Sequence, residues 1–515
     1  MTSSAGVDGS GRSGTILLAG VIAAAVAFRL WLIAAIDFPI NDGALFLEFV
    51  RATAASFPAL PTAVAYNGFT LPFAYPPLSF WFGALLTKLG AEPLETVRIL
   101  PILINILYVI LFVPLLLKSG RTRLFTALFL LFFCFRLRSF EWLVMGGGLS
   151  RGFGSIFLVA ALLAVTLPGP RGKRELPIWR AALGGLFVGG AILSHLEWGV
   201  LAAASLVTSR ALGARSVRGF LLQIVLAGAA ASALVLPWLL LIYHGHGVEP
   251  FFAASGSSLW SLAESLNLLF DLLRPAVANP FILVGGITLL LRRDWFWFAF
   301  IVLCVFLTPR HSATPLAIPL SIFAAQGVLT VWPLFERFIR PRLAAAAAIA
   351  AAISLVATLN AYRHHRGTEG QFRPLAKETR EAMAWVAKNH RGASFAVFNT
   401  AHWYYDSSAE WFPSIAQARS TTTVQGREWL PNQAFAKTST LASELKHSRS
   451  CPEALARLRP FGSYDFLWAE TMRHCFAAPA FTPVYSNSKV TIFRPNASPP
   501  LGAGQQVVEQ GPARR

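Results

Sequence analysis

Several apolar stretches in this chain are long enough to cross a lipid bilayer as α-helices. Thr15–Ile36, Phe220–Ile242 and Leu343–Leu359 contain one charged residue between them, Arg29. A hydrocarbon core about 30 Å thick needs roughly 17 to 25 helical residues at about 1.5 Å per residue. Hydrophobic residues make up 55% of the 515 residues and charged residues 13%, whereas about a quarter of a soluble domain is charged. The sequence therefore predicts a polytopic α-helical membrane protein.

The net charge of +19 is distributed in a way that excludes a nucleic-acid-binding face. Arg and Lys cluster in short loops between apolar stretches, which is the pattern of cytoplasmic loops. The residues in these loops are Lys118, Arg121, Arg123, Arg171, Lys173, Arg174, Arg180, Arg210, Arg215, Arg218, Arg292, Arg293, Arg337, Arg340 and Arg342. If all these loops are cytoplasmic, the N-terminus lies inside and the C-terminus outside, and Tyr75–Gly90 is a juxtamembrane or re-entrant segment.

This topology predicts about eleven transmembrane helices and a soluble C-terminal domain. We place the spans at residues 15–36, 97–117, 122–137, 149–167, 178–195, 197–210, 220–242, 276–291, 294–308, 313–333 and 342–361. The domains would be a cytoplasmic tail (1–14), a transmembrane domain (15–365) with a first outer loop (37–96), an extracytoplasmic α/β domain (371–497) and a disordered tail (498–515).

The C-terminal domain reads as α/β because helical and strand patterns alternate within it. Glu378–Asn389 has helical spacing, and Ser394–Phe398 and Tyr464–Trp468 have strand texture. The pair Thr482–Tyr485 and Lys489–Phe493 is typical of a hairpin. The two cysteines of this domain, Cys451 and Cys475, could form a disulfide or could occur together by chance.

Two acidic residues follow the first apolar stretch. An ionisable group near lipid has an unfavourable free energy unless it has a functional role or a polar partner. Asp42 precedes Gly43–Ser56, an amphipathic helix suited to the membrane interface. Asp42 or Asn41 could simply cap this helix, and Asp37 could simply mark the interfacial end of the first span. Arg29, inside that span, is expected to snorkel outward.

The segment Phe73–Trp81 adds a second feature, a Tyr-Pro-Pro-Leu sequence at the start of a helix. One span, an acidic residue before a juxtamembrane helix, this motif, many further spans and an outer C-terminal domain follow in order. That order resembles the GT-C superfamily of integral-membrane glycosyltransferases, particularly the branch of bacterial lipid A aminoarabinose transferases and protein O-mannosyltransferases. Ala409–Pro413 and Val424–Trp429 are similar to the tails of uncharacterised bacterial membrane glycosyltransferases.

The resemblance implies transfer of a sugar, with inversion, from a polyprenyl-phosphate-linked donor to a lipid, glycan or protein acceptor. The reaction would take place at the outer face of a bacterial plasma membrane. The family's acidic residue maps best onto Asp42, as general base, and Asp37 is its rival because no second acid flanks Asp42. No cofactor is implied. The loop has no Asp-x-Asp signature, so we expect no metal either.

Further outer-side residues are candidates for binding the substrate. Arg310 with His311 is the first candidate for stabilising the leaving phosphate, and Arg138 is the second. His195 and Glu197, at a turn between two spans, could contact substrate, hold a metal with His244 and His246, or be structural. Tyr75, Glu410 and Trp411 complete the set of substrate-binding candidates, and the run His402–Asp406 could contact carbohydrate or lipid headgroups.

Three other classes of function remain open from the sequence. A transporter or flippase of lipid-linked saccharide is the main alternative, although such proteins place ionisable residues at mid-membrane between repeated halves. A polysaccharide ligase or polymerase would use the His244–Arg274 loop, and a membrane scaffold would leave the outer Arg and His residues unexplained.

Overall fold

The computed structural model describes residues 11–166, 176–256, 279–308, 312–336, 374–431, 433–476 and 480–496. These residues divide into two compact units. The first unit lies within Met1–Thr62, Pro72–Phe251 and Ser258–Pro374, and the second within Ala63–Leu71, Phe252–Ser257 and Leu375–Arg515.

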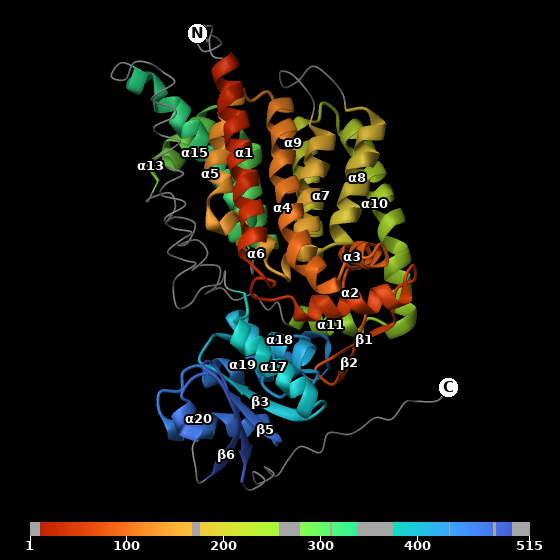
Figure 1. The fold of residues 1–515 in the computed structure, drawn as a ribbon. Helices are drawn as coiled ribbons and strands as arrows, with labels where there is room; N and C mark the ends of the chain where they lie inside the picture. The colour runs from red at the N-terminus through yellow and green to blue at the C-terminus, as the bar shows by residue number, and fades with distance from the viewer. Residues whose placement is uncertain are drawn as a thin grey trace. The chain divides into compact units, whose positions relative to one another are not determined.

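Five helices of the first unit are long and apolar enough to cross a membrane (Figure 1). They are α1 (Gly11–Ala35), α4 (Pro93–Lys118), α7 (Gly148–Val165), α10 (Val217–His246) and α15 (Ala313–Glu336). α10 has 30 residues, and at about 1.5 Å per residue it is about 45 Å long, longer than a hydrocarbon core.

Five further apolar helices fall at other predicted spans. They are α5 (Arg123–Cys134), α8 (Ile178–Ile192), α9 (Leu196–Gly213), α13 (Pro280–Leu291) and α14 (Trp295–Leu307). These helices are shorter or less apolar than a single crossing needs, so within the described ranges length and composition show five spans. The count of eleven stays a prediction. The predicted span at 342–361 lies outside the described residues.

Short elements connect the long helices. They are α2 (Ala44–Ser56), α3 (Leu78–Lys88), η2 (Leu137–Ser139), α6 (Glu141–Val144) and α11 (Glu249–Gly256). α3 has 11 residues and is about 16 Å long, which is too short to cross a hydrocarbon core. In α2, the predicted apolar face is buried, including Leu45, Phe49 and Val50, whereas Glu48 pairs with Arg51.

Close helix packing in the first unit depends on small residues. α4, α7, α8 and α10 pack successively against one another (Figure 1). A Cβ atom on Gly185 of α8 would lie 2.1 Å from the carbonyl oxygen of Ala227 in α10, so only glycine permits this approach. Such contacts between small residues bring helix backbones together where the surrounding lipid is as apolar as the side chains.

Arg29 does not snorkel to the surface, so that prediction is wrong. Its side chain is only 1% exposed inside the helix bundle. Nε donates to Asn105 Oδ1 at 2.9 Å, Nη1 donates to the carbonyl of Cys134 at 3.0 Å, and the guanidinium lies 5.0 Å from the centroid of the Phe140 ring. Polar partners and an aromatic face within the bundle replace the water that snorkelling would provide.

The second unit contains a five-stranded mixed sheet. Its spatial order is β4 (Arg419–Ser420), β3 (Ser394–Phe398), β5 (Phe466–Ala469), β7 (Thr491–Pro495) and β6 (Phe481–Ser486). β3 runs parallel to both β4 and β5, whereas β7 runs antiparallel to β5 and to β6. β5 is buried along its whole length, as expected for a central strand covered on both faces.

Helices and 3-10 turns accompany this sheet. They are α17 (Lys377–Asn389), η3 (Trp403–Tyr405), α18 (Ser407–Ala416), η4 (Arg427–Trp429), α19 (Ala434–Leu445), α20 (Cys451–Leu458), η5 (Arg459–Phe461) and η6 (Arg473–Phe476). Cys451 and Cys475 are joined by a disulfide, one of the two possibilities that the sequence left open. Their bond links the start of α20 to η6 beside the apolar cluster that contains Phe476 and Leu458.

A hairpin from the first loop, β1 (Ala63–Tyr66) and β2 (Phe69–Pro72), belongs through Leu71 to the second unit. Its turn residues, Asn67 and Gly68, have φ values of 53° and 77°, the pair of positive angles that a two-residue type I′ turn requires. Asn-Gly is the preferred sequence for this turn because both residues tolerate positive φ.

Candidate active site

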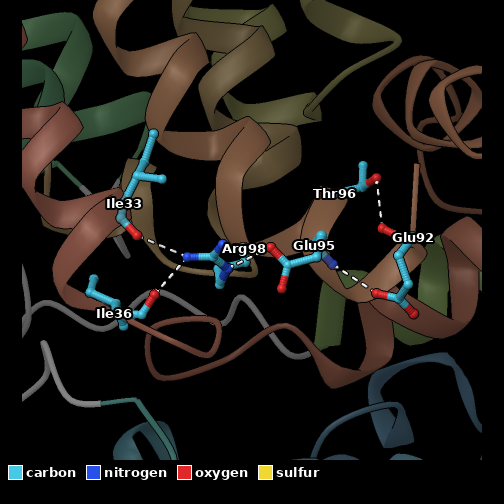
Figure 2. Close-up of polar contacts among 6 residues, drawn as sticks. All are labelled: Ile33, Ile36, Glu92, Glu95, Thr96 and Arg98. Atoms are coloured by element: carbon cyan, nitrogen blue, oxygen red, sulfur yellow. Dashed lines mark hydrogen bonds and ion pairs between the residues drawn. The ribbon is translucent and has the colours of Figure 1, made fainter. Parts of the chain in front are cut away.

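The chain segment that carries Asp42 begins at a fixed point, the C-terminal end of α1. Arg98 of α4 donates from Nη1 to the carbonyl oxygens of Ile33 and Ile36, at 2.9 and 2.6 Å (Figure 2). Glu95 holds the other side of this guanidinium, with Nε donating to its Oε2 at 2.8 Å. A cation at the last carbonyls of a helix satisfies acceptors that lack helical partners and complements the helix dipole.

The Asp42 carboxylate lies at the N-terminal end of α7. Gly147 N donates to Oδ1 at 2.9 Å, and Arg151 Nη2 lies 3.3 Å from Oδ2. The N-cap residue of α2 is Gly43 rather than Asp42 or Asn41, and the Asp42 carboxylate accepts from the Gly147 amide at the start of α7 instead. A helix N-terminus and a guanidinium both stabilise negative charge, so this position suits a carboxylate.

Glycines allow the two chain segments to approach at Asp42. A Cβ atom on Gly146 would lie 2.1 Å from the Asp42 carbonyl oxygen, and one on Gly147 would lie 2.4 Å from Oδ2. Gly43, with φ of 129°, faces Gly146 in the same contact. The backbone is joined directly as well, since Gly146 N donates to the carbonyl of Ile40 at 3.1 Å. Gly146 and Gly147 therefore form the surface against which Asp42 packs.

Arg151 is a site residue that the sequence did not single out from the other outer-side cations. Its Nε donates to the carbonyl of Trp142 at 3.2 Å, and its guanidinium lies 5.3 Å from the centroid of the Trp142 ring. The side chains of Arg151 and Asp42 remain 10% and 18% exposed. The sequence feature that could have indicated Arg151 is its position one helical turn after three consecutive glycines. No local pattern, however, connects those glycines to Asp42.

Tyr75 and His195 lie beside this pair. The Tyr75 hydroxyl is 3.3 Å from Ser150 Oγ, next to Arg151 in sequence, and its ring packs edge-on against His195 at a centroid distance of 6.5 Å. The predicted Tyr-Pro-Pro-Leu motif is held against the turn before α9, because Leu78 N donates to the carbonyl of Leu193 at 2.8 Å. Three segments of the first unit thus converge on Asp42 and Arg151.

The other predicted residues of the first unit are placed differently. Asp37 is exposed in the bend after α1. Arg138 is half exposed and pairs with the fully buried Glu141 at 2.8 Å, whereas Glu197 is half-buried in the first turn of α9. Arg310 and His311 lie outside the described residues.

Glu410 and Trp411 form part of the core of the second unit. Trp411 is fully buried and Glu410 is 4% exposed in α18. The carbonyl oxygen of Glu410 accepts from the Tyr66 hydroxyl at 2.8 Å. Both residues support the fold around the hairpin. Their contact with substrate stays a prediction.

A small pocket in the second unit is lined by Asn399, Trp403, Asp406 and Gln425, among others. Asn399 Nδ2 and the Ala409 amide donate to Asp406 Oδ1, at 2.6 and 2.9 Å. Burial raises the pKa of Asp406 to about 7 despite these hydrogen bonds. Contact of this region with carbohydrate stays a prediction.

Metal-ligand geometry occurs at one place among the described residues. Cys451, His474 and Cys475 bring their ligand atoms within 4.8 Å of one another, but the two cysteines form a disulfide. A disulfide has no thiolate to offer a metal. The sequence left His246 open as a metal ligand. In the structure its Nε2 lies 2.8 Å from the carbonyl oxygen of Thr62.

Comparison with known proteins identifies the fold. No protein-family model and no curated protein matches the sequence. ArnT from Cupriavidus metallidurans bound to undecaprenyl phosphate aligns with a TM-score of 0.54 and 13% identity, over 92% of this chain and 98% of that chain. The Archaeoglobus fulgidus oligosaccharyltransferase tethered to an acceptor peptide gives 0.51 and 12%, over 88% and 69%.

A third solved structure, the arabinofuranosyltransferase AftD from mycobacteria, has a TM-score of 0.51 and 15% identity. The alignment covers 92% of this chain and 41% of that chain. All three are GT-C superfamily membrane glycosyltransferases, so the chain has the GT-C fold that the sequence resemblance predicts.

Proposed function

We propose that this protein is a membrane glycosyltransferase that transfers a sugar from a polyprenyl-phosphate-linked donor to an acceptor, with Asp42 as general base. The observation that carries the proposal is the placement of Asp42, held by the Gly147 amide and facing Arg151, on a GT-C fold. An acid, a cation and hydroxyl-bearing side chains converge there from three segments of one unit.

Asp42 supplies the proton acceptor. One lone pair of its carboxylate accepts the acceptor's hydroxyl proton while the hydroxyl oxygen forms a bond to the anomeric carbon. The bond from that carbon to the phosphate oxygen breaks, and the electron pair leaves with the lipid phosphate. Attack from the face opposite the leaving group inverts the anomeric carbon. The Gly147 amide and the short approach through glycine fix the carboxylate during this step.

Arg151 is the described cation best placed to stabilise the leaving phosphate. It is 3.3 Å from Asp42 and already desolvated, and a guanidinium matches phosphate geometry with paired donors. Stabilising charge that develops on the leaving group lowers the barrier selectively. Arg310 with His311 stays in the proposal as a second source of positive charge.

Arg138 is a weaker candidate than Arg151. Its partner Glu141 is fully buried, whereas the Asp42 side chain beside Arg151 is 18% exposed, so recruiting Arg138 to a phosphate would cost more than recruiting Arg151. Tyr75 and His195 are proposed to hydrogen-bond sugar or acceptor hydroxyls, because they lie beside the Asp42–Arg151 pair. Glu197, two residues after His195 in the first turn of α9, is proposed to do the same. No metal or cofactor is part of this mechanism.

The lipid-linked donor is supported by a structural neighbour. The ArnT structure contains undecaprenyl phosphate, and it aligns over almost its full length with this chain. The proposed range of acceptors, which are lipids, glycans or proteins, rests on the resemblance to GT-C enzymes. No residue of this chain selects among them. We place the reaction at the outer face of a bacterial plasma membrane, because the basic loops predict that the Asp42 end of α7 faces outward.

The proposal is tested by supplying purified protein in detergent with a panel of undecaprenyl-phosphate sugars and extracted envelope glycolipids. Liquid chromatography with mass spectrometry follows undecaprenyl phosphate and the glycosylated acceptor. We expect both products in equal amounts for at least one donor. Movement of intact donor across proteoliposome membranes without either product would instead establish a flippase.

A further inference from the structure

The end of α7 opposite Asp42 is surrounded by positive charge. Lys118 Nζ and Arg180 Nη2 each donate to the same carbonyl oxygen, that of Leu163, both at 3.3 Å. Arg180 Nη2 also donates to the carbonyl of Thr166 at 2.6 Å. Two cations from α4 and α8 therefore lie in direct proximity at the C-terminus of one helix.

A third cation joins them. Arg210 of α9 reaches the same region through Gln223, because its Nε donates to Gln223 Oε1 at 2.8 Å and Gln223 Nε2 donates to the carbonyl of Leu176, four residues before Arg180, at 3.5 Å. Arg180 and Arg210 are 7% and 6% exposed, and Lys118 is half-buried. Among the residues that the structure describes, no carboxylate lies within ion-pair distance of any of the three.

Helix capping accounts for only part of this charge. The C-terminus of a helix carries about half a negative charge, so three cations leave an excess of roughly two and a half positive charges. Buried cations are ordinarily paired because desolvation is costly. Arg121, which follows α4, shows the ordinary solution in the same unit, since its guanidinium pairs with Asp294. The cluster at α7 lacks an equivalent partner among the described side chains.

The surroundings of the cluster indicate what supplies the missing negative charge. Trp179, directly before Arg180, is 64% exposed, and Ile178 is 56% exposed. An exposed Trp at the end of an apolar helix is typical of the headgroup level of a bilayer. α7 has 18 residues, so about 27 Å separates this end from Asp42, close to the thickness of a hydrocarbon core.

We propose that Lys118, Arg180 and Arg210 bind the phosphate of an anionic phospholipid headgroup at the membrane face opposite the Asp42 site. Basic pockets between transmembrane helices are a common means of binding such headgroups. This site is separate from the proposed donor site, which lies at the other end of α7, and it does not depend on the reaction that the protein catalyses.

The test measures lipid retention by native mass spectrometry of the full-length protein in detergent with added phosphatidylglycerol or phosphatidylcholine. We expect selective retention of phosphatidylglycerol, and about fivefold weaker retention in Lys118→Gln, as for loss of one charge near a headgroup. Arg218→Gln is the matched control, because Arg218 is exposed near the same end of the bundle. It should behave as the unmodified protein does.

Four outcomes would overturn the site. Equal retention of the two lipids, or unchanged retention in Lys118→Gln, would show that the cluster only caps α7. Displacement of the lipid by millimolar inorganic phosphate would indicate a site for a soluble anion instead. A marked gain in retention in Glu175→Gln would mean that this acid, which precedes Arg180 by five residues in sequence and lies outside the described residues, is the counter-ion. An unchanged thermal unfolding midpoint in phosphatidylcholine controls for folding of each variant.

Discussion

Asn67 and Ser420 lie 353 residues apart in sequence and exchange two hydrogen bonds. Asn67 Nδ2 donates to the Ser420 carbonyl at 2.8 Å, and Ser420 N donates to Asn67 Oδ1 at 2.6 Å. The side chain of Asn67 thus pairs with the backbone of β4 as a neighbouring strand would. The turn of the β1–β2 hairpin is therefore a structural part of the second unit, although it lies in the sequence between Asp42 and Tyr75.

Substituting Asn67 with Ala is expected to destabilise the second unit by about 1–3 kcal/mol, because a buried amide and carbonyl of Ser420 would lose their partner. Pulse proteolysis of the full-length protein in increasing urea measures this change. Asn389→Ala is the control, since its exposed side chain makes a single bond to the Trp385 carbonyl. Equal effects of the two substitutions would mean that the hairpin is not held by Asn67.

Substituting Gly147 with Ala is expected to reduce kcat about 100-fold, because the new Cβ would lie 2.4 Å from Asp42 Oδ2 and displace the carboxylate. Gly228→Ala is the control, since a Cβ there meets nothing within 4 Å. Steady-state rates of lipid phosphate release measure the effect. Full activity in Gly147→Ala would show that catalysis does not require the carboxylate in its present position.

Substituting Arg151 with Gln is expected to lower kcat by about 10²–10³, as for removal of one group that stabilises developing charge. Arg151→Lys should recover only part of the rate, because a lysine lacks the paired donors of a guanidinium. The exposed Arg51, which pairs with Glu48 on α2, provides the control substitution Arg51→Gln. If Arg151→Gln raised KM alone, Arg151 would contribute to binding the ground state rather than to the leaving-group step.

The stability of the second unit is expected to depend on the protonation of Asp406. Burial raises the pKa of this carboxyl from 3.8 to about 7, so the folded form holds the proton more tightly than the unfolded chain does. Its stabilising contribution is complete below about pH 4 and is lost as the pH rises through 7. Burial also raises the pKa of the nearby Glu470, which acts in the same direction.

Urea midpoints of the second unit between pH 5 and pH 8 measure this dependence. Asp406→Asn should flatten the profile, because an amide does not titrate but still can cap α18 as the carboxyl does. A profile with the same slope in Asp406→Asn would rule out Asp406 as its source.

Local sequence patterns were sufficient to locate most of the secondary structure. The apolar runs gave α4, α7 and α10 to within a few residues, and the amphipathic pattern of Gly43–Ser56 predicted α2. Periodicity and length carry this information because each element satisfies its own backbone and buries one face.

The contacts between residues of the site could not be predicted from local sequence patterns. Asp42 meets Gly147 and Arg151, which are 105 and 109 residues away, and no local pattern encodes such pairs. The same limit explains the error at Arg29, whose partners Asn105 and Cys134 come from other helices. The predicted membrane side and the charge of each residue restricted the candidate site residues to one end of the helix bundle. Only the packing of α7 against the first loop showed which of them lie together.

The role of Asp42 as general base is the central claim, and a comparison of two single substitutions tests it most directly. Release of undecaprenyl phosphate from the preferred donor is measured for Asp42→Asn and for Asp37→Asn. We predict a loss of about 10²–10⁴-fold in Asp42→Asn, the usual contribution of general-base catalysis, with Asp37→Asn close to the unmodified protein. Undiminished turnover in Asp42→Asn, or the reverse order of the two effects, would contradict the account.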